Sequence, residues 1–502
     1  MNIRYTDEIN VTGGKIRGRY QEDSVAVFKG IPYAAPPVGK LRFRPPQPHE
    51  GWQGTLDCLE FGKSPLQNAI DDEKSILWTK EFLISNREMS EDCLTLNIWA
   101  DLRGEDMPVI VYFFGGGLVS GGSSCEIYDG TVLAKQGVVY VTFNHREGTL
   151  GLLSCEKLSV EALEGTSGNY LLLDEIAVLR WVRENIRSFG GNPDNITIMG
   201  QSSGAMEVNA LSVSPLAKGL FRQTISMSFN SCFDKTFGRP WISKEEGYEE
   251  SANVLRAHSR SEEDLFSVTA EEFAADPKIK NLTIDGRVLD CSFREAIKRG
   301  DTNNTLTVMG MVPGDNLLHG PFVCLFGPLE KITEESQLKK AAGMLLGDRA
   351  EEFETLYLSD SRSPVEVKKA VEEDFLISSM LWFAGQRKKA GAKTPTLLYY
   401  FTHVLPGPMS DRFGAFHSCE VPYFFNVFSD FRKDYWAEDD FSLGKYVSDN
   451  LAKLVKDDEV SDFEKVPDDG YSYLRIGDHG GAICRIDGTA RDLWFYTFEK
   501  MK

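Results

Sequence analysis

The feature that most constrains the fold is a serine set between glycines at the end of an apolar run. Ile196-Thr-Ile-Met199 has the composition of a strand and leads directly into Gly200-Gln-Ser-Ser-Gly204. The pattern Gly-x-Ser-x-Gly places a serine on a turn so tight that its hydroxyl stands above the sheet, and the glycines relieve the crowding. A helix is expected to begin at about Ala205. Ser202 is therefore the candidate nucleophile, against the alternative of an ordinary Gly/Ser turn.

The segments before this turn predict an α/β fold. Residues 109–114 and 138–143 are nearly continuous apolar runs, which is typical of strands buried on both faces. Residues 171–186 repeat apolar side chains at helical spacing and end before the Gly190-Gly191 pair. Strand, helix and strand in this order predict a right-handed parallel crossover, and hence a mostly parallel, twisted central sheet flanked by helices.

The run at 109–114 ends in three glycines at positions 115–117. A backbone without side chains can approach a ligand closely and offer N–H groups to an anion that develops during a reaction. The alternative is a flexible glycine turn without a chemical role.

A serine nucleophile needs a base, most often a histidine that a buried carboxylate orients. Among seven histidines, His417 is distinct because it lies in a loop after Gly414 and just before an apolar segment. In α/β-hydrolases the chain order is serine, acid, histidine, which places the acid between 202 and 417. Many carboxylates lie there, and composition cannot choose among them. Asp315 is our choice because the β-type run from Asn304 delivers it at its end; the alternative is a solvated or capping carboxylate.

Charge and cysteine usage exclude several classes of protein. The formal charge of −20 opposes nucleic acid or an anionic membrane as a partner, because both need clustered Lys and Arg. The nine cysteines are dispersed and form no Cys-x-x-Cys pair, which argues against a disulfide framework and a zinc site. We expect no metal and no organic cofactor. The acidic N-terminus and the short apolar runs predict a cytoplasmic protein, unless a leader has been removed. The oligomeric state stays open.

The remaining chain predicts one domain over residues 1–502 with helical insertions. Polar and charged segments with helical pieces cover about 235–300 and 325–395, and such insertions often cover an α/β active site. An independent second domain is the alternative, but no linker composition marks its boundary.

Several blocks in a fixed order resemble the type-B carboxylesterases, the cholinesterase-like branch of the α/β-hydrolase fold. The resemblance is dense from about 11 to 232 and returns at about 283–320 and 411–428. Its motifs are Phe28-Lys-Gly-Ile-Pro-Tyr-Ala-Ala-Pro-Pro-Val-Gly39, Leu41-Arg-Phe-Arg-Pro-Pro46, Ser90-Glu-Asp-Cys-Leu-Thr-Leu-Asn97 and Trp181-Val-Arg-Glu-Asn-Ile-Arg-Ser-Phe-Gly-Gly-Asn-Pro-Asp-Asn-Ile196.

The resemblance implies a catalytic triad of Ser202, Asp315 and His417. It also implies an oxyanion hole formed by the N–H groups of Gly116, Gly117 and Ser203, and two structural ion pairs, Arg42 with Glu91 and Arg146 with Asp174.

The chain departs from the family pattern near the site. Phe114 replaces a usual His and Leu118 a common Phe, while Gln201 and Ser203 replace the usual Glu and Ala. Loss of that Glu argues against recognition of choline-type cations. Leu66 stands where the family's disulfide partner of Cys93 is expected, which agrees with an intracellular enzyme.

These observations predict a serine carboxylesterase that acts on a small-molecule ester. Four apolar side chains flank the predicted site and are candidates for substrate binding, with the core as their alternative location: Phe114, Leu118, Phe229 and Phe416. Such a pocket suits neutral esters with short to medium acyl or aromatic, hydroxycinnamate-type groups. The alternative function is a noncatalytic adhesion or scaffold protein on the same fold, which the complete triad disfavours.

Overall fold

The fold was analysed in a computed structural model. The structure describes residues 3–68, 80–82, 84–85, 88–163, 165–230, 232, 241–275, 279–303, 305–316, 332–359, 361–408, 410–456 and 460–500.

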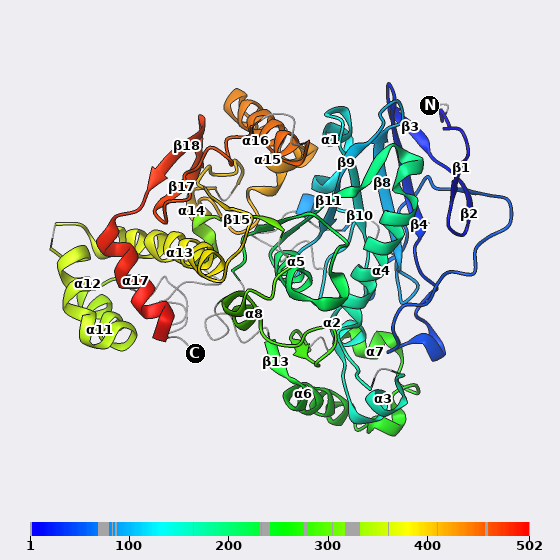
Figure 1. Ribbon diagram of the computed structural model, residues 1–502, viewed down its shortest axis with the longest axis horizontal. Coiled ribbons are helices and arrows are strands. Elements are labelled where there is room, and N and C mark those ends of the chain that lie inside the picture. Colours follow the sequence, from blue (N-terminus) through cyan, green and yellow to red (C-terminus); the bar gives the residue numbers. More distant parts are fainter. Residues whose placement is uncertain are drawn as a thin grey trace.

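An eleven-stranded, mostly parallel sheet forms the centre of the molecule, with the N-terminal strands at one edge and β18 at the other (Figure 1). In spatial order its strands are β18 (Gly480–Arg485), β17 (Ser472–Gly477), β16 (Thr396–Phe401), β15 (Leu306–Met311), β12 (Gln223–Met227), β11 (Gly191–Gln201), β9 (Met107–Phe113), β10 (Val139–Phe143), β8 (Thr95–Asp101), β4 (Val25–Pro32) and β3 (Arg19–Glu22). The predicted strands at 109–114, 138–143 and 196–199 are thus neighbours in one parallel set.

The apolar run of β9 is buried on both faces, as its composition predicts. Alternate side chains point to opposite sides of a strand. Val109, Val111 and Phe113 accordingly pack with helices α4 and α5, whereas Ile110 and Tyr112 pack with α1 and α16. Helices therefore cover both faces of the sheet. The bounds of these helices are α1 (Thr131–Lys135), α4 (Tyr170–Asn185), α5 (Ser203–Val213) and α16 (Glu438–Lys456).

Helices also occupy the two predicted insertions. The first holds α6 (Lys244–Ala257), α7 (Ala270–Ala275) and α8 (Phe293–Arg299), and the second holds α11 (Glu335–Leu346), α12 (Ala350–Tyr357) and α13 (Pro364–Lys389). Residues 235–240, 276–278, 325–331 and 360 of these ranges lie outside the described residues. The single-domain organisation stays a prediction.

Smaller elements complete the described chain. They are the strands β1 (Ile9–Val11), β2 (Gly14–Arg17), β5 (Thr55–Asp57), β6 (Ser64–Pro65), β7 (Met89–Ser90), β13 (Trp241–Ser243) and β14 (Leu282–Ile284), and the helices α2 (Gly148–Leu152), α3 (Glu156–Glu161), α14 (Ser410–Phe413), α15 (Val421–Phe425) and α17 (Gly488–Lys500). Within the described residues, no helix is both long enough and apolar enough to cross a membrane.

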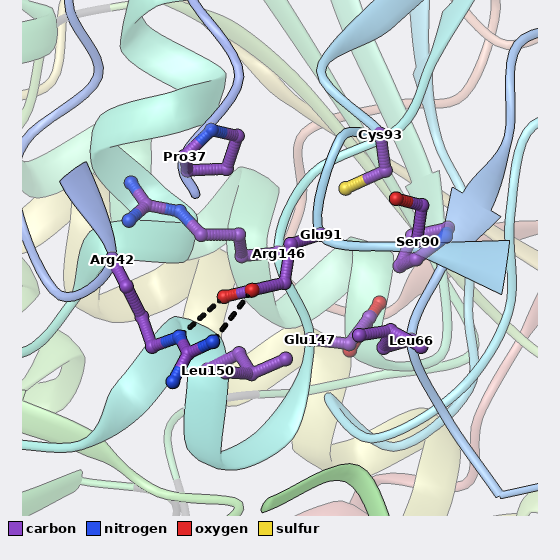
Figure 2. A pocket seen from close by; sticks show the side chains of 10 residues that line it. Pro37, Arg42, Leu66, Ser90, Glu91, Cys93, Arg146, Glu147 and Leu150 are labelled. Carbon is purple, nitrogen blue, oxygen red and sulfur yellow. Dashed lines mark hydrogen bonds and ion pairs between the residues drawn. The ribbon is translucent and has the colours of Figure 1, made fainter. Parts of the chain in front are cut away.

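Two ion pairs tie the loops of the amino-terminal half together, as the resemblance implies. Arg42 donates two hydrogen bonds to Glu91, at 2.5 and 2.7 Å (Figure 2). Arg146 donates in the same bidentate manner to the buried Asp174, at 2.8 and 2.6 Å. Bidentate pairs of this kind fix geometry as well as charge.

A small cavity beside these ion pairs is lined by both Leu66 and Cys93 (Figure 2). The Cys93 thiol is buried and free. The disulfide expected for the family is therefore absent at this position, as the sequence indicates.

Candidate active site

Ser202 occupies a strained backbone position between β11 and α5. Its φ of 60° and ψ of −125° lie where a residue with a side chain is rarely found, and its N–H donates to the carbonyl of Met227 at 3.0 Å. A Cβ atom at Gly204 would lie 2.2 Å from the carbonyl oxygen of Phe113, so only glycine fits there. The helix begins at Ser203, two residues before the predicted start, because the strained turn ends at the nucleophile itself.

Three residues that are far apart in sequence form one hydrogen-bonded chain at this turn. His417 Nε2 lies 2.8 Å from Ser202 Oγ, and His417 Nδ1 lies 2.6 Å from Asp315 Oδ1. The carboxylate is fully buried and the imidazole nearly so. The structure thus brings together the three residues that the sequence predicts as a triad, in the geometry that a serine, a base and an orienting acid require.

The loop after β15 fixes the carboxylate of Asp315. This residue ends the short 3-10 helix Pro313–Asp315, and its Oδ2 accepts the N–H of Val312 at 2.8 Å. Each oxygen of the carboxylate therefore has a defined partner, and the fixed carboxylate in turn orients the ring of His417. Asn304, where the predicted run begins, lies outside the described residues.

A second buried acid, which was not predicted from the sequence, lies beside the three predicted triad residues. Glu420 is fully buried and accepts the hydroxyl of Ser228 at 2.5 Å. Burial, together with the nearby Asp315 carboxylate, raises the pKa of Glu420 to about 7. Its position three residues after His417 is the only signal that the sequence gives. Gln201 also contacts the base, with its Nε2 3.3 Å from His417 Nε2.

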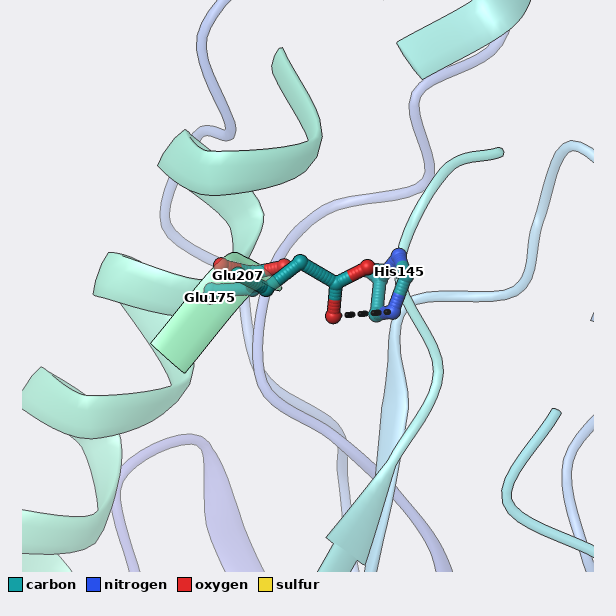
Figure 3. Close-up of side chains that lie close together, drawn as sticks. All are labelled: His145, Glu175 and Glu207. Carbon is teal, nitrogen blue, oxygen red and sulfur yellow. Dashed lines mark ion pairs between the residues drawn. The ribbon is translucent and has the colours of Figure 1, made fainter. Parts of the chain in front are cut away.

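Three further ionisable side chains converge on the side of the sheet that α4 and α5 cover. His145 follows β10, Glu175 lies in α4 and Glu207 lies in α5 (Figure 3). All three are fully buried, and their possible ligand atoms lie within 4.8 Å of one another. Of the described residues, this set has the composition and spacing to hold a metal ion, and it contains none of the three predicted triad residues.

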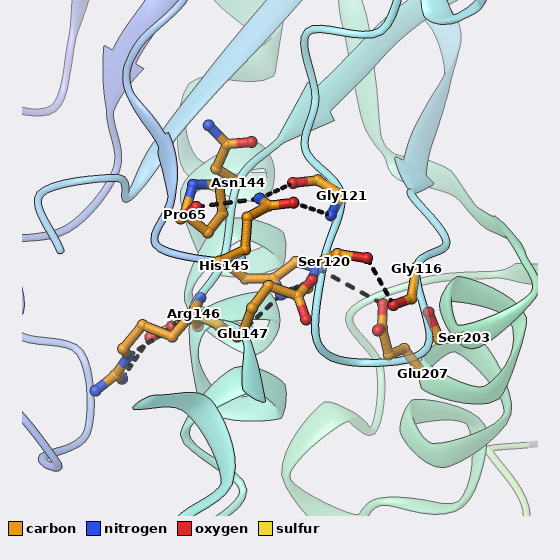
Figure 4. A network of polar contacts seen from close by, with 12 residues as sticks. Pro65, Gly116, Ser120, Gly121, Asn144, His145, Arg146, Glu147, Ser203 and Glu207 are labelled. Carbon is orange, nitrogen blue, oxygen red and sulfur yellow. Dashed lines mark hydrogen bonds and ion pairs between the residues drawn. The ribbon is translucent and has the colours of Figure 1, made fainter. Parts of the chain in front are cut away.

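The glycine loop after β9 lies next to this cluster, with Gly116 close to Ser203 at the start of α5 (Figure 4). The ring of Phe114 stacks on His145, with 4.5 Å between centroids and 4° between planes. Gly116 has a φ of 147°, and a Cβ atom there would lie 1.7 Å from the carbonyl oxygen of Ser120. This position therefore requires glycine.

One of the three predicted oxyanion donors already has a partner. The N–H of Gly117 donates to the hydroxyl oxygen of Ser203 at 2.9 Å. The hydroxyl belongs to the residue that departs from the usual Ala, so this contact follows directly from the departure. A ligand oxygen that uses the Gly117 N–H must displace or share this hydrogen bond.

The four predicted substrate-binding side chains are all largely buried: Phe114, Leu118, Phe229 and Phe416. Leu118 and Phe229 pack in the cluster that includes α5, and Phe416 packs against Phe82 on the other side of the sheet. Phe229, at 8% exposure, is the most accessible of the four. Their role in substrate binding stays a prediction.

Comparison with known proteins gives a consistent result. The model of the "Carboxylesterase family" matches residues 6–485. A fumonisin B1 esterase of Sphingopyxis macrogoltabida is 33% identical over 417 residues, which cover 80% of this chain and 72% of that protein. A para-nitrobenzyl esterase of Bacillus subtilis (strain 168) is 32% identical over 434 residues, covering 82% and 81%. A solved PNB esterase structure superposes with a TM-score of 0.76 at 26% identity and covers 97% of this chain and 99% of its own.

Proposed function

Because the chain belongs to the carboxylesterase family and is a carboxylic ester hydrolase, we propose that Ser202, His417 and Asp315 carry out its chemistry as a catalytic triad. The observation that carries the proposal is the unbroken hydrogen-bonded chain from Ser202 Oγ through His417 to Asp315. No observation on the described residues favours the noncatalytic alternative.

The proposed reaction proceeds through an acyl-enzyme. His417 Nε2 takes the proton of Ser202 as Oγ forms a bond to the ester carbonyl carbon, and then gives that proton to the alcohol oxygen as the ester bond breaks. His417 next takes a proton from water as the water oxygen bonds to the acyl carbon. It gives that proton to Ser202 Oγ as the bond from Oγ to the acyl carbon breaks, which releases the acid and restores the serine. Asp315 holds the Nδ1–H tautomer throughout.

The N–H groups of Gly116, Gly117 and Ser203 are the proposed donors to the carbonyl oxygen as it becomes negative. Each such donor contributes on the order of 10²–10³ in rate in serine hydrolases. The Ser203 hydroxyl modifies this hole, because the Gly117 N–H must turn from it toward the ligand.

We further propose neutral esters with short to medium acyl or aromatic groups as substrates. The side chains that flank the site are mainly apolar or aromatic, and a largely apolar site cannot compensate the desolvation of a charged substrate. Two relatives carry the names of esterases for fumonisin B1 and for para-nitrobenzyl esters. The buried free thiol of Cys93 supports a cytoplasmic location.

Substitution of the nucleophile tests the triad. Ser202→Ala is expected to retain the fold and lose turnover by at least about 10³-fold, and to take no label from an organophosphonate ester. Peptide mass analysis of the labelled wild-type protein is expected to place the phosphonate on Ser202. The matched control is Ser203→Ala, which keeps the nucleophile and is expected to be labelled. Labelling of Ser202→Ala at wild-type rate would contradict the assignment.

A substrate panel tests the proposed specificity. We expect kcat/KM to be highest for p-nitrophenyl esters of short to medium acids and for methyl hydroxycinnamates, and at least about tenfold lower for acetylcholine and emulsified triglyceride. A preference for acetylcholine or for the emulsion would overturn the substrate proposal and leave the triad assignment unaffected.

A further inference from the structure

The cluster of His145, Glu175 and Glu207 has no role in the proposed acyl transfer. It joins three separate elements: the loop after β10, α4 and α5. Its side chains point toward one another in the interior of the molecule (Figure 3). A buried group of this kind needs a physical explanation, because unpaired polar atoms in an interior are costly.

With both carboxyl groups ionised, the facing atoms of the cluster are all hydrogen-bond acceptors. His145 Nδ1 lies 3.3 Å from the carbonyl oxygen of Arg146, so the ring hydrogen belongs on Nδ1 and Nε2 carries a lone pair. That lone pair faces Glu207 Oε2 at 3.7 Å, which is too long for a hydrogen bond. Among the described residues, no donor outside the cluster reaches Nε2 or the carboxylate oxygens of Glu175 and Glu207, and these two carboxyl groups lie against one another.

A further buried acidic side chain adjoins the cluster. Glu147 is a third buried carboxylate, with its Oε1 3.7 Å from His145 Nδ1. The neighbouring cation, Arg146, donates to Asp174 instead. A bound cation would give these facing acceptor atoms a common partner.

We propose that His145 Nε2 and the carboxylates of Glu175 and Glu207 bind one divalent transition-metal ion, with zinc as the representative ion. Imidazole with carboxylates is a ligand set for this class of ion, and two carboxylates balance its charge. Zinc bonds of about 2.0–2.2 Å in a tetrahedral arrangement place ligand atoms roughly 3.3 Å apart. The 3.7 Å between His145 Nε2 and Glu207 Oε2 needs only a small adjustment. The carbonyl of Arg146 at the other ring nitrogen is the partner that a metal-bound histidine ordinarily has.

The proposed ion is structural and does not act on the ester. It fastens α5, which begins at Ser203, to α4 and to the loop whose His145 stacks on Phe114. The helix of the nucleophile and the glycine loop are thereby held against one another. The proposal does not depend on the assignment of the triad.

Metal content of the full-length protein tests the site. Protein without a histidine tag is incubated with ZnCl₂, freed of excess ion by gel filtration and analysed by plasma mass spectrometry and native mass spectrometry. We expect about one zinc per chain and a higher Tm than for the metal-free protein. Glu207→Gln and Glu175→Gln are each expected to lower zinc affinity at least about tenfold. Asp478→Asn, which removes a carboxylate that contacts His403 at 2.7 Å, is the matched control and is expected to retain the zinc.

Two results would overturn the proposal. The first is less than about a tenth of an equivalent of zinc in the wild-type protein. The second is a zinc content that the Glu175 and Glu207 variants leave unchanged, which would place the ion elsewhere. The wild-type measurement decides the matter even where a variant fails to fold. If zinc does not bind, protons shared between Glu175 and Glu207 would satisfy the two carboxylates. In that case Glu207→Gln is expected to raise the Tm near pH 8.

Discussion

At the scale of single residues, the unusual feature of the candidate active site is the hydroxyl beside the proposed nucleophile, Ser202. Ser203 accepts the N–H of Gly117, a donor that the proposed mechanism directs at the carbonyl oxygen of the ester. The hydrogen bond is made in the ligand-free geometry and must be given up in the transition state. An ordinary hydrogen bond between neutral groups contributes about 1 kcal/mol.

Removal of this hydroxyl is expected to accelerate the reaction. Ser203→Ala frees the Gly117 N–H, so kcat should rise up to about fivefold for p-nitrophenyl acetate, with little change in KM. Ser203→Thr keeps the hydroxyl and serves as the control. A fall of tenfold or more in Ser203→Ala would mean that the hydroxyl itself donates to the oxyanion, which contradicts the inhibitory role.

Sequence reasoning found the residues of the hydrogen-bonded chain because each follows a local pattern. Ser202 lies in a five-residue turn motif, and Asp315 is delivered by a strand end. Glu420 and the His145 cluster escaped it, because their importance arises from burial next to residues more than 25 positions away. No periodicity or turn motif in the sequence predicts contacts between such distant residues.

At the scale of elements, the boundaries follow from local sequence more closely in the sheet than in the insertions. The predicted strands at 109–114 and 138–143 match β9 and β10 within two residues, because their apolar runs begin and end abruptly, whereas β11 begins at Gly191, five residues before the predicted Ile196. Helix α13 has a less regular pattern of apolar and polar residues: it spans 26 residues and buries Glu372 together with several polar side chains. That carboxyl is 6% exposed, and its Oε1 has no hydrogen-bond partner among the described residues.

Glu372 is expected to make the stability of the protein depend on pH. Burial raises its pKa from an ordinary value of 4.5 to about 7. The folded state therefore binds this proton more tightly than the unfolded state, so its contribution is favourable below pH 4.5 and is lost as pH rises through 7. The loss amounts to about 3 kcal/mol by pH 8.

Glu372→Gln removes this dependence and should raise the free energy of unfolding at pH 8, with little gain at pH 5, in urea titrations. Glu373→Gln is the control in the same helix turn. It breaks a partly exposed pair with Arg475 and should change stability by less than about 1 kcal/mol at either pH. An equal effect of Glu372→Gln at both pH values would contradict the assignment.

At the scale of the whole molecule, the net charge of −20 acts on substrates before they reach the site. An acidic surface repels anions over about one Debye length, which is near 8–10 Å at physiological salt and longer in dilute buffer. The effect belongs to no single carboxylate and requires no contact. It also adds to the preference for neutral esters that the apolar surroundings of the site favour.

Salt is therefore expected to distinguish charged from neutral esters. A rise in NaCl from about 10 to 200 mM should increase kcat/KM severalfold for an ester with a free carboxylate and leave its methylated, neutral analogue nearly unchanged. Initial rates at substrate concentrations well below KM measure this directly. The same salt response for both esters would show that bulk charge has no part in selectivity.

The long sequence separations within the hydrogen-bonded chain bear on how the enzyme is made. His417 lies 215 residues from Ser202 and 102 from Asp315, and the three reach the site through β11, β15 and the segment after β16. Contacts between distant segments form late and slowly during folding. Partly folded chains should therefore hold most of their secondary structure before His417 and Asp315 reach Ser202. Recovery of activity after refolding then reports that β11, β15 and the segment after β16 have assembled.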